Sequence, residues 1–412
     1  MKRIVSAVIM TGSAALFSIS TVEDVSASTS IDTNAWYRLS TYWKGRCESL
    51  DVINDGINNN LHLVKSGNFS GQLWKLTPTS DGHFQLSTMW LGANKVLEVK
   101  SDGNTVQLNA KAKTRWYSKP YNQYWDITPE SIDSTYRITN VWRGPAYSLD
   151  IINDTINNSL PTLASSGYYS GQFWRLTKAD FVTPPPIEMQ LDPFYKKYLN
   201  ADGIPIVSSD LTPDDALYRV QFLTLNMMAR MPQVRDEMIR HNIKIAVMAD
   251  TEVTTDIPEH SFLPPSWDQR ARGLGATLQV PTSSCAEENL LCYTQDPYTK
   301  EDIFVHEFAH SIANLGLAPL YPFFQSELQA AYDNAIATGL WENTYAITNI
   351  EEYFAEGVQD WFNVNAQSEV PNSIHNFVNT REELKDYDPL LYSLISKWFV
   401  WDDGNCSCHE PE

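Results

Sequence analysis

The sequence has little positive charge. It contains 30 Lys and Arg residues against 50 Asp and Glu residues, which gives a formal net charge of −20 at pH 7. Nucleic acids and anionic membranes bind proteins through positive patches, and a negative field of this size repels both. We therefore expect neither of them as a main partner.

The sequence also lacks long apolar runs beyond its first residues. Lys2 and Arg3 precede an apolar stretch at residues 4–19, which Ser and Thr interrupt and which is shorter than the ~20 residues that cross a bilayer. Val-Ser-Ala at residues 25–27 is typical of a signal cleavage site. We expect residues 1–27 to be a cleaved signal peptide rather than a membrane anchor. The expected protein is secreted and extracellular, with no transmembrane segment.

Cysteine is scarce, with five residues in the chain. An exported protein meets an oxidising environment in which disulfides persist, and an odd number leaves one thiol over. Cys285 and Cys292 lie close together in one polar segment, so we predict a disulfide between them. The sequence leaves the partners of Cys47, Cys406 and Cys408 open. No second Cys or His pair has finger-like spacing, which disfavours zinc binding by Cys406 and Cys408.

The chain is too long for a single core, and its first half contains an internal repeat. The segment 37–59 recurs as 136–158, and a weaker copy begins at Phe84. Each copy ends in Gln-x-Trp, and these motifs are Gln72-Leu73-Trp74, Gln123-Tyr124-Trp125 and Gln172-Phe173-Trp174. Repeated units rich in short alternating segments and Gly/Asn turns predict an all-β array with pseudo-threefold symmetry.

Three Gln-x-Trp motifs in this setting resemble the ricin-B-type β-trefoil lectins, over about residues 34–178. The resemblance implies a glycan-binding domain in which each Trp lies in the core and each Gln helps to hold the sugar-site loop. It also implies that an early acidic residue of each repeat holds sugar; Glu98 takes this place in the middle repeat. The candidate sugar-binding residues are Asp51, His62, Gln72, Asp150 and Gln172.

This sequence departs from the lectin pattern at the positions around the motif. The Asn that often precedes Gln is Gly71 or Gly171 in the outer repeats. The expected stacking aromatic is replaced by His62, Lys113 and Thr162, so a platform from Phe69 or from Tyr168 and Tyr169 is the alternative. A trefoil that only positions the second domain is the other alternative.

The second half has a different character. Three consecutive prolines at 184–186 favour a stiff spacer, and we place a linker at 179–187. Apolar spacing predicts a helix and two strands, at 216–231, 243–249 and 275–280 respectively. We expect an α+β domain at 188–402, followed by a Cys-containing acidic tail at 403–412.

The strongest chemical signal is His306-Glu307-Phe308-Ala309-His310. Helix positions four apart share a face, so both imidazoles can reach one Zn²⁺ while Glu307 faces its bound water. We expect a helix with Thr299 as its cap and Gly316 as its stop. Two satisfied core histidines are the alternative interpretation.

A second helix, beginning after Thr348 or Asn349, offers Glu352 and Glu356 on one face. One carboxylate can complete a His, His, Glu set, and the other can accept a ring N–H from a ligand His. A solvated helix face is the alternative. By the same reasoning we expect Glu287 to lie in a solvated loop.

The two motifs together resemble the gluzincin metallopeptidases, most closely the catalytic domain of anthrax lethal-factor-type enzymes, over about residues 300–362. The resemblance implies Glu352 as the third zinc ligand, Glu356 as the residue behind the ligands, Glu307 as the base and Tyr345 as the hydroxyl that stabilises the transition state. The predicted fold is thus a multidomain chain, an all-β β-trefoil followed by an α+β zincin-like metallopeptidase domain.

The resulting hypothesis is a secreted zinc endopeptidase that cleaves protein or peptide substrates and is targeted to glycosylated surfaces by its trefoil. One alternative is a lectin whose metallopeptidase-like domain is inactive or latent. Another is a zinc-stabilised interaction domain, in which a protein ligand fills the fourth zinc position.

Overall fold

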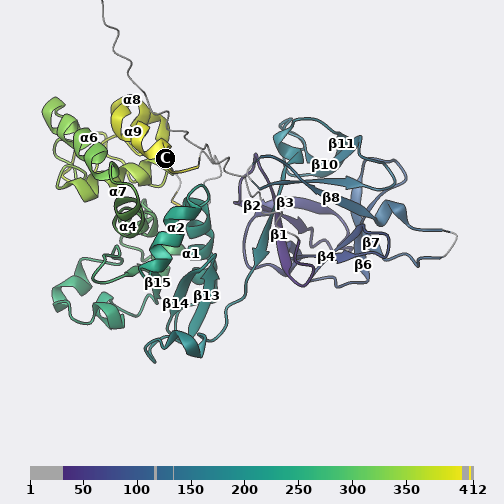
Figure 1. Cartoon of the computed structure of the whole chain (residues 1–412), viewed down its shortest axis with the longest axis horizontal. Helices are drawn as coiled ribbons and strands as arrows, with labels where there is room; N and C mark the ends of the chain where they lie inside the picture. The colour runs from purple at the N-terminus through teal and green to yellow at the C-terminus, as the bar shows by residue number, and fades with distance from the viewer. Residues whose placement is uncertain (1–30, 116–117, 133, 401–407, 410–412) are drawn as a thin grey trace, which may run out of the picture. The chain divides into compact units, whose positions relative to one another are not determined.

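The computed structural model describes residues 31–115, 118–132, 134–400 and 408–409 (Figure 1). The predicted signal peptide and most of the predicted tail lie outside these residues. Among the described helices, none combines the length and the apolar character needed to cross a membrane.

The N-terminal region consists of β-strands. They are β1 (Trp36–Thr41), β2 (Glu48–Val52), β3 (Leu61–Lys65), β4 (Trp74–Pro78), β5 (Phe84–Thr88), β6 (Lys95–Val99), β7 (Val106–Ala110), β8 (Trp125–Pro129), β9 (Tyr136–Asn140), β10 (Tyr147–Ile151), β11 (Pro161–Ser165) and β12 (Trp174–Ala179). Strands β1, β4, β5, β8, β9 and β12 pair in a closed ring, and β2–β3, β6–β7 and β10–β11 form hairpins. This β-trefoil arrangement confirms the predicted all-β region with three repeats.

The Gln-x-Trp tryptophans build the core of this region. Trp74, Trp125 and Trp174 are fully buried. Each indole N–H donates to the backbone carbonyl of the leucine at the same place in its own repeat, at 2.8–2.9 Å. Because the three bonds are equivalent, the repeated sequence gives a repeated packing unit.

The predicted linker is only partly separate from the second region. Strand β12 ends at Ala179, and Thr183 pairs with Tyr198 at the edge of the second sheet. The Val182 backbone N–H also donates to the Tyr218 hydroxyl at 3.3 Å. The residues just before the three prolines are therefore anchored to the second region.

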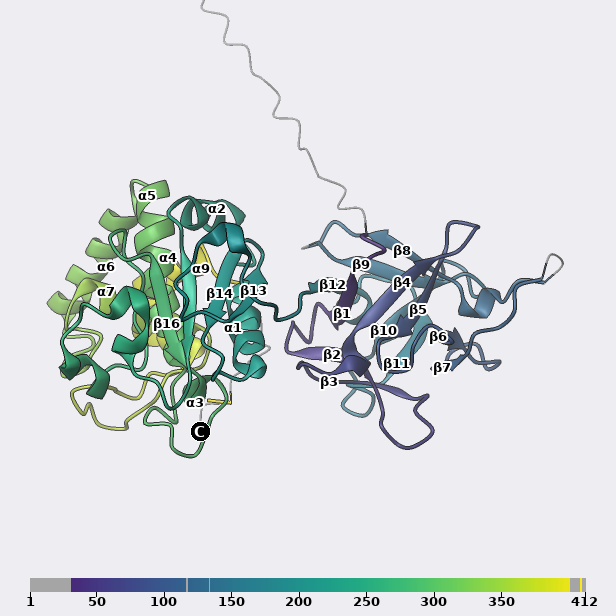
Figure 2. The same cartoon turned by 90° about the horizontal axis from the view of Figure 1, so that it is seen from below.

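The second region is a mixed α/β fold around a four-stranded sheet. Its strands are β13 (Lys197–Ala201), β14 (Ile204–Ser208), β15 (Lys244–Met248) and β16 (Thr282–Ala286), in that order. The pair β13–β14 is antiparallel, and β14, β15 and β16 run parallel. Figure 2 shows α4 (Ile303–Ile312) beside β16, and one apolar core joins the sheet to the helices.

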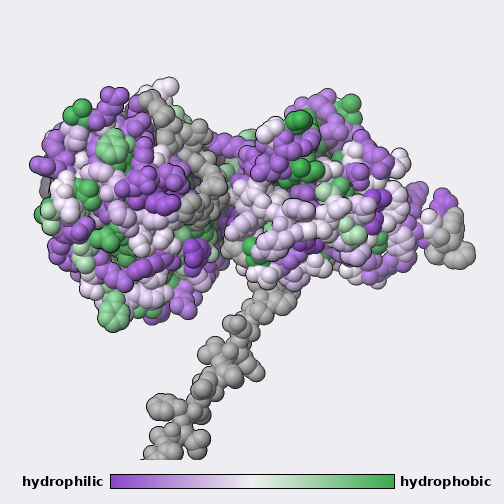
Figure 3. All heavy atoms as spheres, turned by 90° about the horizontal axis from the view of Figure 1, so that it is seen from above, coloured by the Kyte–Doolittle hydropathy of each residue, from purple (hydrophilic) through white to green (hydrophobic). Residues whose placement is uncertain are grey.

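The other helices of this region are α1 (Asp214–Met227), α2 (Pro232–Arg240), α3 (Glu287–Leu290), a π-helical turn (Ala313–Leu317), α5 (Ala318–Leu320), α6 (Phe324–Thr338), α7 (Ile350–Trp361), α8 (Arg381–Tyr387) and α9 (Pro389–Ser396). Short 3₁₀ turns in the two regions lie at Ser70–Gln72, Tyr121–Gln123, Ser170–Gln172, Ile187–Met189, Thr254–Asp256, Pro258–His260 and Pro265–Gln269. On the face shown in Figure 3, apolar side chains occur in small groups within a mostly polar surface.

The predicted strand at 243–249 is confirmed as β15, but the strand predicted at 275–280 is wrong. Leu274 alone bridges to Ser284, and a turn closes where the Thr277 N–H donates to the Val280 carbonyl at 2.9 Å. The strand at this place is β16, which is buried along its whole length. Its small residues have no apolar alternation, so periodicity did not predict it.

Helix boundaries differ from the prediction in detail. The helix predicted at 216–231 is α1, which ends at Met227, and Pro232 begins α2. Asp302 caps α4 in place of Thr299. The chain stays helical past Gly316, since a π-helical turn leads into α5.

Candidate functional site

The motif at residues 306–310 and the acidic segment at residues 352–356 lie on two helices, α4 and α7, that pack together. His306 and His310 project from α4, and Glu352 projects from the first turn of α7, which Asn349 caps. His306 Nε2 lies 2.9 Å from Glu352 Oε2 and 3.1 Å from His310 Nε2, and His310 Nε2 lies 3.3 Å from the same carboxylate oxygen. The structure therefore brings the three predicted metal ligands together.

These distances suit a tetrahedral metal. Ligands at about 2.0–2.1 Å from Zn²⁺ in tetrahedral geometry lie about 3.3 Å from one another. His306, His310 and Glu352 each offer one ligand atom in such a cluster. Two imidazole nitrogens and one carboxylate are a zinc donor set that leaves a fourth position open.

The electrostatics of the cluster favour a cation. Burial lowers the pKa of His306, but the hydrogen bond to Glu352 and the charge of Glu307 outweigh it and raise this pKa to about 10. Burial raises the pKa of Glu352, but the hydrogen bonds to His306 and His310 outweigh it and hold the pKa well below its usual range. A proton or a metal ion can meet this demand for positive charge.

Glycines bring the neighbouring backbone close to Glu307. A Cβ atom on Gly273 would lie 3.1 Å from Glu307 Cγ, and one on Gly275 would lie 2.5 Å from His310 Cβ. The extended segment that contains these glycines is attached to β16 through the two Leu274–Ser284 hydrogen bonds. It therefore forms one wall beside the metal ligands.

Tyr345 also contacts the cluster, and its hydroxyl donates to Glu352 Oε1 at 3.1 Å. Its ring is 6.3 Å from that of His306, and 37% of the residue is exposed. Burial and the nearby Glu352 charge raise the pKa of Tyr345, so its hydroxyl stays a hydrogen-bond donor at neutral pH.

Behind the ligands lies a buried polar layer. His306 Nδ1 is 2.8 Å from Gln359 Oε1 and 3.6 Å from Glu356 Oε1. The role assigned to Glu356 stays a prediction, and Gln359 is the nearer acceptor. Sequence reasoning missed Gln359, although it lies on the same face of α7 as Glu352 and Glu356. His375 lies beside this layer, with its Nε2 3.8 Å from Glu301 Oε1.

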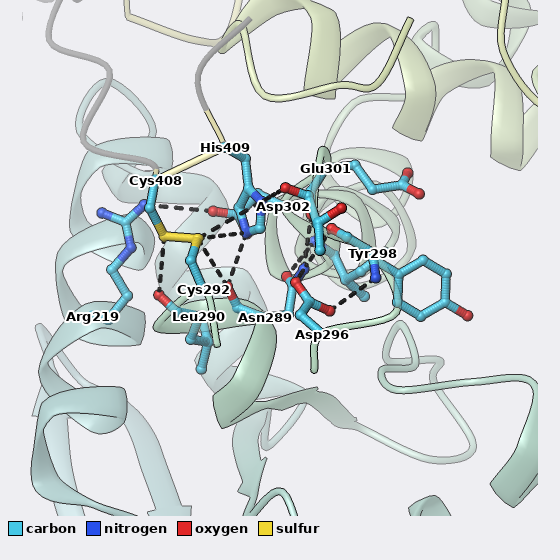
Figure 4. Close-up of a disulfide and its surroundings, with 12 residues drawn as sticks. Arg219, Asn289, Leu290, Cys292, Asp296, Tyr298, Glu301, Asp302, Cys408 and His409 are labelled. Carbon is cyan, nitrogen blue, oxygen red and sulfur yellow. Dashed lines mark hydrogen bonds and ion pairs between the residues drawn. A yellow bond between two sulfur atoms is a disulfide. The ribbon is translucent and has the colours of Figure 1, made fainter. Parts of the chain in front are cut away.

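Asn289 holds the entry to α4 (Figure 4). Its Oδ1 accepts from the Ile303 N–H at 2.9 Å, and its Nδ2 donates to the carbonyls of Tyr298 and Glu301 at 3.2 and 2.8 Å. Asp302, which caps the helix, also pairs with the half-buried Arg219 at 3.5 Å. The position of the metal helix therefore depends on the loop that precedes it.

The predicted Cys285–Cys292 disulfide is wrong. Cys292 bonds to Cys408 (Figure 4). Cys285 is a buried free thiol on β16. Cys47 is also disulfide-bonded. Residues 292 and 408 are separated by 116 positions, and nothing in the sequence near Cys292 points to that partner.

The solvated loop expected at Glu287 is wrong too. Glu287 is 5% exposed and begins α3 directly after β16. Burial and the nearby charges of Asp250 and Glu288 raise the pKa of Glu287 to about 7.

In the trefoil, the glutamine of each Gln-x-Trp motif holds the acidic residue of its own repeat. Nε2 of Gln72 and Nε2 of Gln172 donate to Asp51 and Asp150 at 3.2 and 3.0 Å. Both glutamines are fully buried. They are therefore placed to orient the carboxylates rather than to touch a ligand from solution.

The three acidic positions differ in their surroundings. Asp150 is 6% exposed, and in the middle repeat Glu98 Oε1 already accepts from Gln107 and Asn109 at 2.8 and 2.7 Å. Asp51 is half-buried and pairs in register with His62 across the β2–β3 hairpin.

An aromatic side chain from the next repeat lies near Asp51. A Cβ atom on Gly71 would lie 2.1 Å from Asp51 Oδ1 and 3.6 Å from the ring of Trp90. Trp90 is 37% exposed, while Tyr168 is 82% exposed and leans edge-on against buried Phe173. Sequence reasoning missed Trp90 because it sought the platform within the same repeat.

No family model matches the chain, and no curated protein matches it. Among solved structures, the designed threefold-symmetric protein ThreeFoil is 22% identical, with 36% of this chain and 100% of that chain covered and a TM-score of 0.29. A ricin B-like lectin of Macrolepiota procera in complex with lactose is 16% identical, with 37% and 100% covered and a TM-score of 0.29. A mosquitocidal holotoxin is 15% identical, with 44% and 21% covered and a TM-score of 0.30. The identities and the TM-scores are low, so these neighbours do not define the function of this chain.

Proposed function

We propose that this chain is a secreted zinc-dependent endopeptidase. The observation that carries the proposal is the convergence of His306, His310 and Glu352 within 3.3 Å of one another, beside Glu307 and Tyr345. In the alternative of two satisfied core histidines, a proton would take the place of the metal between Glu352 and the imidazoles. The signal-like residues 1–27 support secretion.

A zinc ion bound there would supply Lewis-acid activation of water and of the scissile carbonyl. Glu307 would then accept the proton of the attacking water and return it to the leaving amine. Tyr345 would donate its hydroxyl hydrogen to the carbonyl oxygen as that oxygen gains charge. This division of work needs a base and a donor beside the ligands: Glu307 follows the ligand His306 on α4, and the Tyr345 hydroxyl donates to the ligand Glu352.

The test combines zinc content with cleavage of a mixed peptide library, with and without a chelator. The variants are Glu307→Gln, which removes the base, and Glu351→Gln, an exposed carboxylate on α7 that serves as the matched control. We expect about one zinc per chain in all three proteins and cleavage in the wild type and the control only. Zinc binding with no cleavage by the wild type would favour the lectin with an inactive or latent domain.

We propose in addition that the trefoil binds glycans, with the first repeat as its best site. The observation that favours this repeat is Asp51, half-buried beside exposed Trp90, where an apolar sugar face and a hydroxyl can be held together. On a glycan array, Asp51→Ala and Trp90→Ala should each abolish binding, and Glu98→Ala should retain it. Binding unaffected by the first two variants would exclude this repeat as the site.

A further inference from the structure

Gln359 is the closest hydrogen-bond partner of the ring nitrogen of His306 that faces away from the metal ligands. Both residues are buried, at 0% and 7% exposed, and the Oε1 to Nδ1 distance is 2.8 Å. Glu356, one turn earlier on α7, is 3.6 Å away and is held by Asn365, whose Nδ2 donates to Glu356 Oε2 at 3.0 Å. The direct contact therefore belongs to the neutral amide and not to the carboxylate.

The direction of the Gln359 amide is determined by its second partner. Its Nε2 donates to the backbone carbonyl of Asp302 at 3.3 Å, and a carbonyl can only accept. A reversed amide would place Gln359 Oε1 against the carbonyl oxygen of Asp302, and both atoms are acceptors. The amide oxygen of Gln359 therefore faces His306. Since that oxygen cannot donate, Nδ1 of His306 must carry the hydrogen.

We propose that Gln359 is a positioning residue that keeps the hydrogen of His306 on Nδ1 and so presents the Nε2 lone pair to the metal. The inference rests on the proposed zinc function. Gln359 also connects His306 to the backbone of Asp302, the cap of α4. The same side chain therefore determines the tautomer of the His306 imidazole and its position relative to the start of the helix.

A neutral acceptor has a chemical consequence at this position. A carboxylate partner increases the basicity of a ligating imidazole, whereas an amide does so less. The layer behind His306 already contains Glu301 and Glu356, and burial raises the pKa of both. An amide orients the ring without adding another buried charge to this layer.

The test measures zinc affinity by chelator competition, together with the visible absorption spectrum of the cobalt-substituted protein. Gln359→Met keeps the length of the side chain and removes the acceptor. We expect its zinc affinity to fall about 10- to 100-fold, as is typical when such partners are lost, with a changed cobalt spectrum. Gln359→Glu keeps an acceptor for His306 but loses the donor to the Asp302 carbonyl, so its affinity should fall less than that of Gln359→Met.

Gln221→Met is the matched control, because this buried glutamine on α1 donates to the backbone carbonyl of Asn200 at 2.6 Å and is not bonded to His306 or to its partners. It should destabilise the protein while the zinc affinity of folded chains stays unchanged. Equal zinc affinity and equal cobalt spectra in the wild type and Gln359→Met would overturn the inference while leaving the proposed function intact. A wild type that binds no zinc overturns both.

Discussion

Gly275 lies directly against His310, so closely that a Cβ atom on the glycine would be 2.5 Å from Cβ of the histidine. The same atom would lie 3.1 Å from the Glu307 carbonyl. Both neighbours belong to α4, and neither is the flexible end of a long side chain. Any substitution at Gly275 must therefore move either the wall of the site or the helix that holds the metal ligands.

We expect Gly275→Ala to lower zinc affinity and peptide cleavage by at least about tenfold, because a shift of a few tenths of an ångström displaces a ligand whose geometry is set by the helix. Gly203→Ala is a suitable control. Its Cβ would meet only the end of the Ile239 side chain, and its φ of +100° makes the change destabilising without involving the site. Zinc affinity that falls equally in both variants would show a general loss of folding instead.

Tyr345→Phe removes the hydroxyl that donates to Glu352. If this hydroxyl stabilises the developing negative charge, kcat should fall about 100-fold or more while zinc content and KM change little. Tyr332→Phe is the matched control, since the Tyr332 hydroxyl donates at 2.8 Å to the carbonyl of Ile347, close to Tyr345 in the chain. The measurement is steady-state kinetics of both variants. A normal kcat for Tyr345→Phe would show that the Tyr345 hydroxyl does not stabilise the transition state.

Glu287 should make stability fall as pH rises. Its pKa is about 7 in the folded chain against an ordinary value of 4.5, so between these values the folded state binds more protons than the unfolded state. Glu287 therefore does not reduce the free energy of unfolding below about pH 4.5, and it reduces this free energy fully above about pH 7. Its Oε2 is also buried without a hydrogen-bond partner in the described residues.

Glu287→Gln cannot ionise, so its Tm should match the wild type near pH 4 and exceed it progressively up to about pH 7. The measurement is a series of thermal melts across this range. Glu382→Gln, an exposed carboxylate on α8, should give a Tm difference that does not vary with pH. A flat difference for Glu287→Gln would show that this carboxyl titrates normally.

The sequence predicted those parts of the molecule that a local repeat or a short spacing specifies. The Gln-x-Trp motifs correctly indicated a threefold core, because the same Trp to backbone hydrogen bond is made in each repeat. The four-residue spacing of His306 and His310 placed both on one face of α4, and Asn349 was among the predicted caps of α7.

The features that were missed depend on tertiary contacts. Strand β16 carries small polar residues that are buried only because helices and other strands cover them. The sequence does not distinguish Gln359 from an ordinary helix residue, because its contact with His306 forms only where α7 packs against α4. The carboxyl of Glu287 is buried at the end of a strand that periodicity had not located.

The Cys292–Cys408 disulfide should stabilise the second region and the entry to the metal helix (Figure 4). Beside it, His409 is 2% exposed, and its ring nitrogens lie 2.9 Å from the Asn289 carbonyl and 3.1 Å from the Thr299 carbonyl. Asn289 also accepts the first N–H of α4. The disulfide region and the start of the metal helix therefore both contact Asn289.

Replacing both Cys292 and Cys408 with serine should lower the free energy of unfolding of this region by about 2–5 kcal/mol, because the bond closes a long loop in the unfolded chain. Hydrogen exchange should also rise at the Ile303 amide, the first of α4, because its partner Asn289 contacts His409 beside the disulfide. Cys285→Ala, which removes the buried free thiol, is the control and should give a smaller loss without faster exchange at the helix start. Urea unfolding followed by hydrogen exchange separates these effects. Unchanged exchange at Ile303 in the double variant would mean that Asn289 holds the metal helix without help from the disulfide.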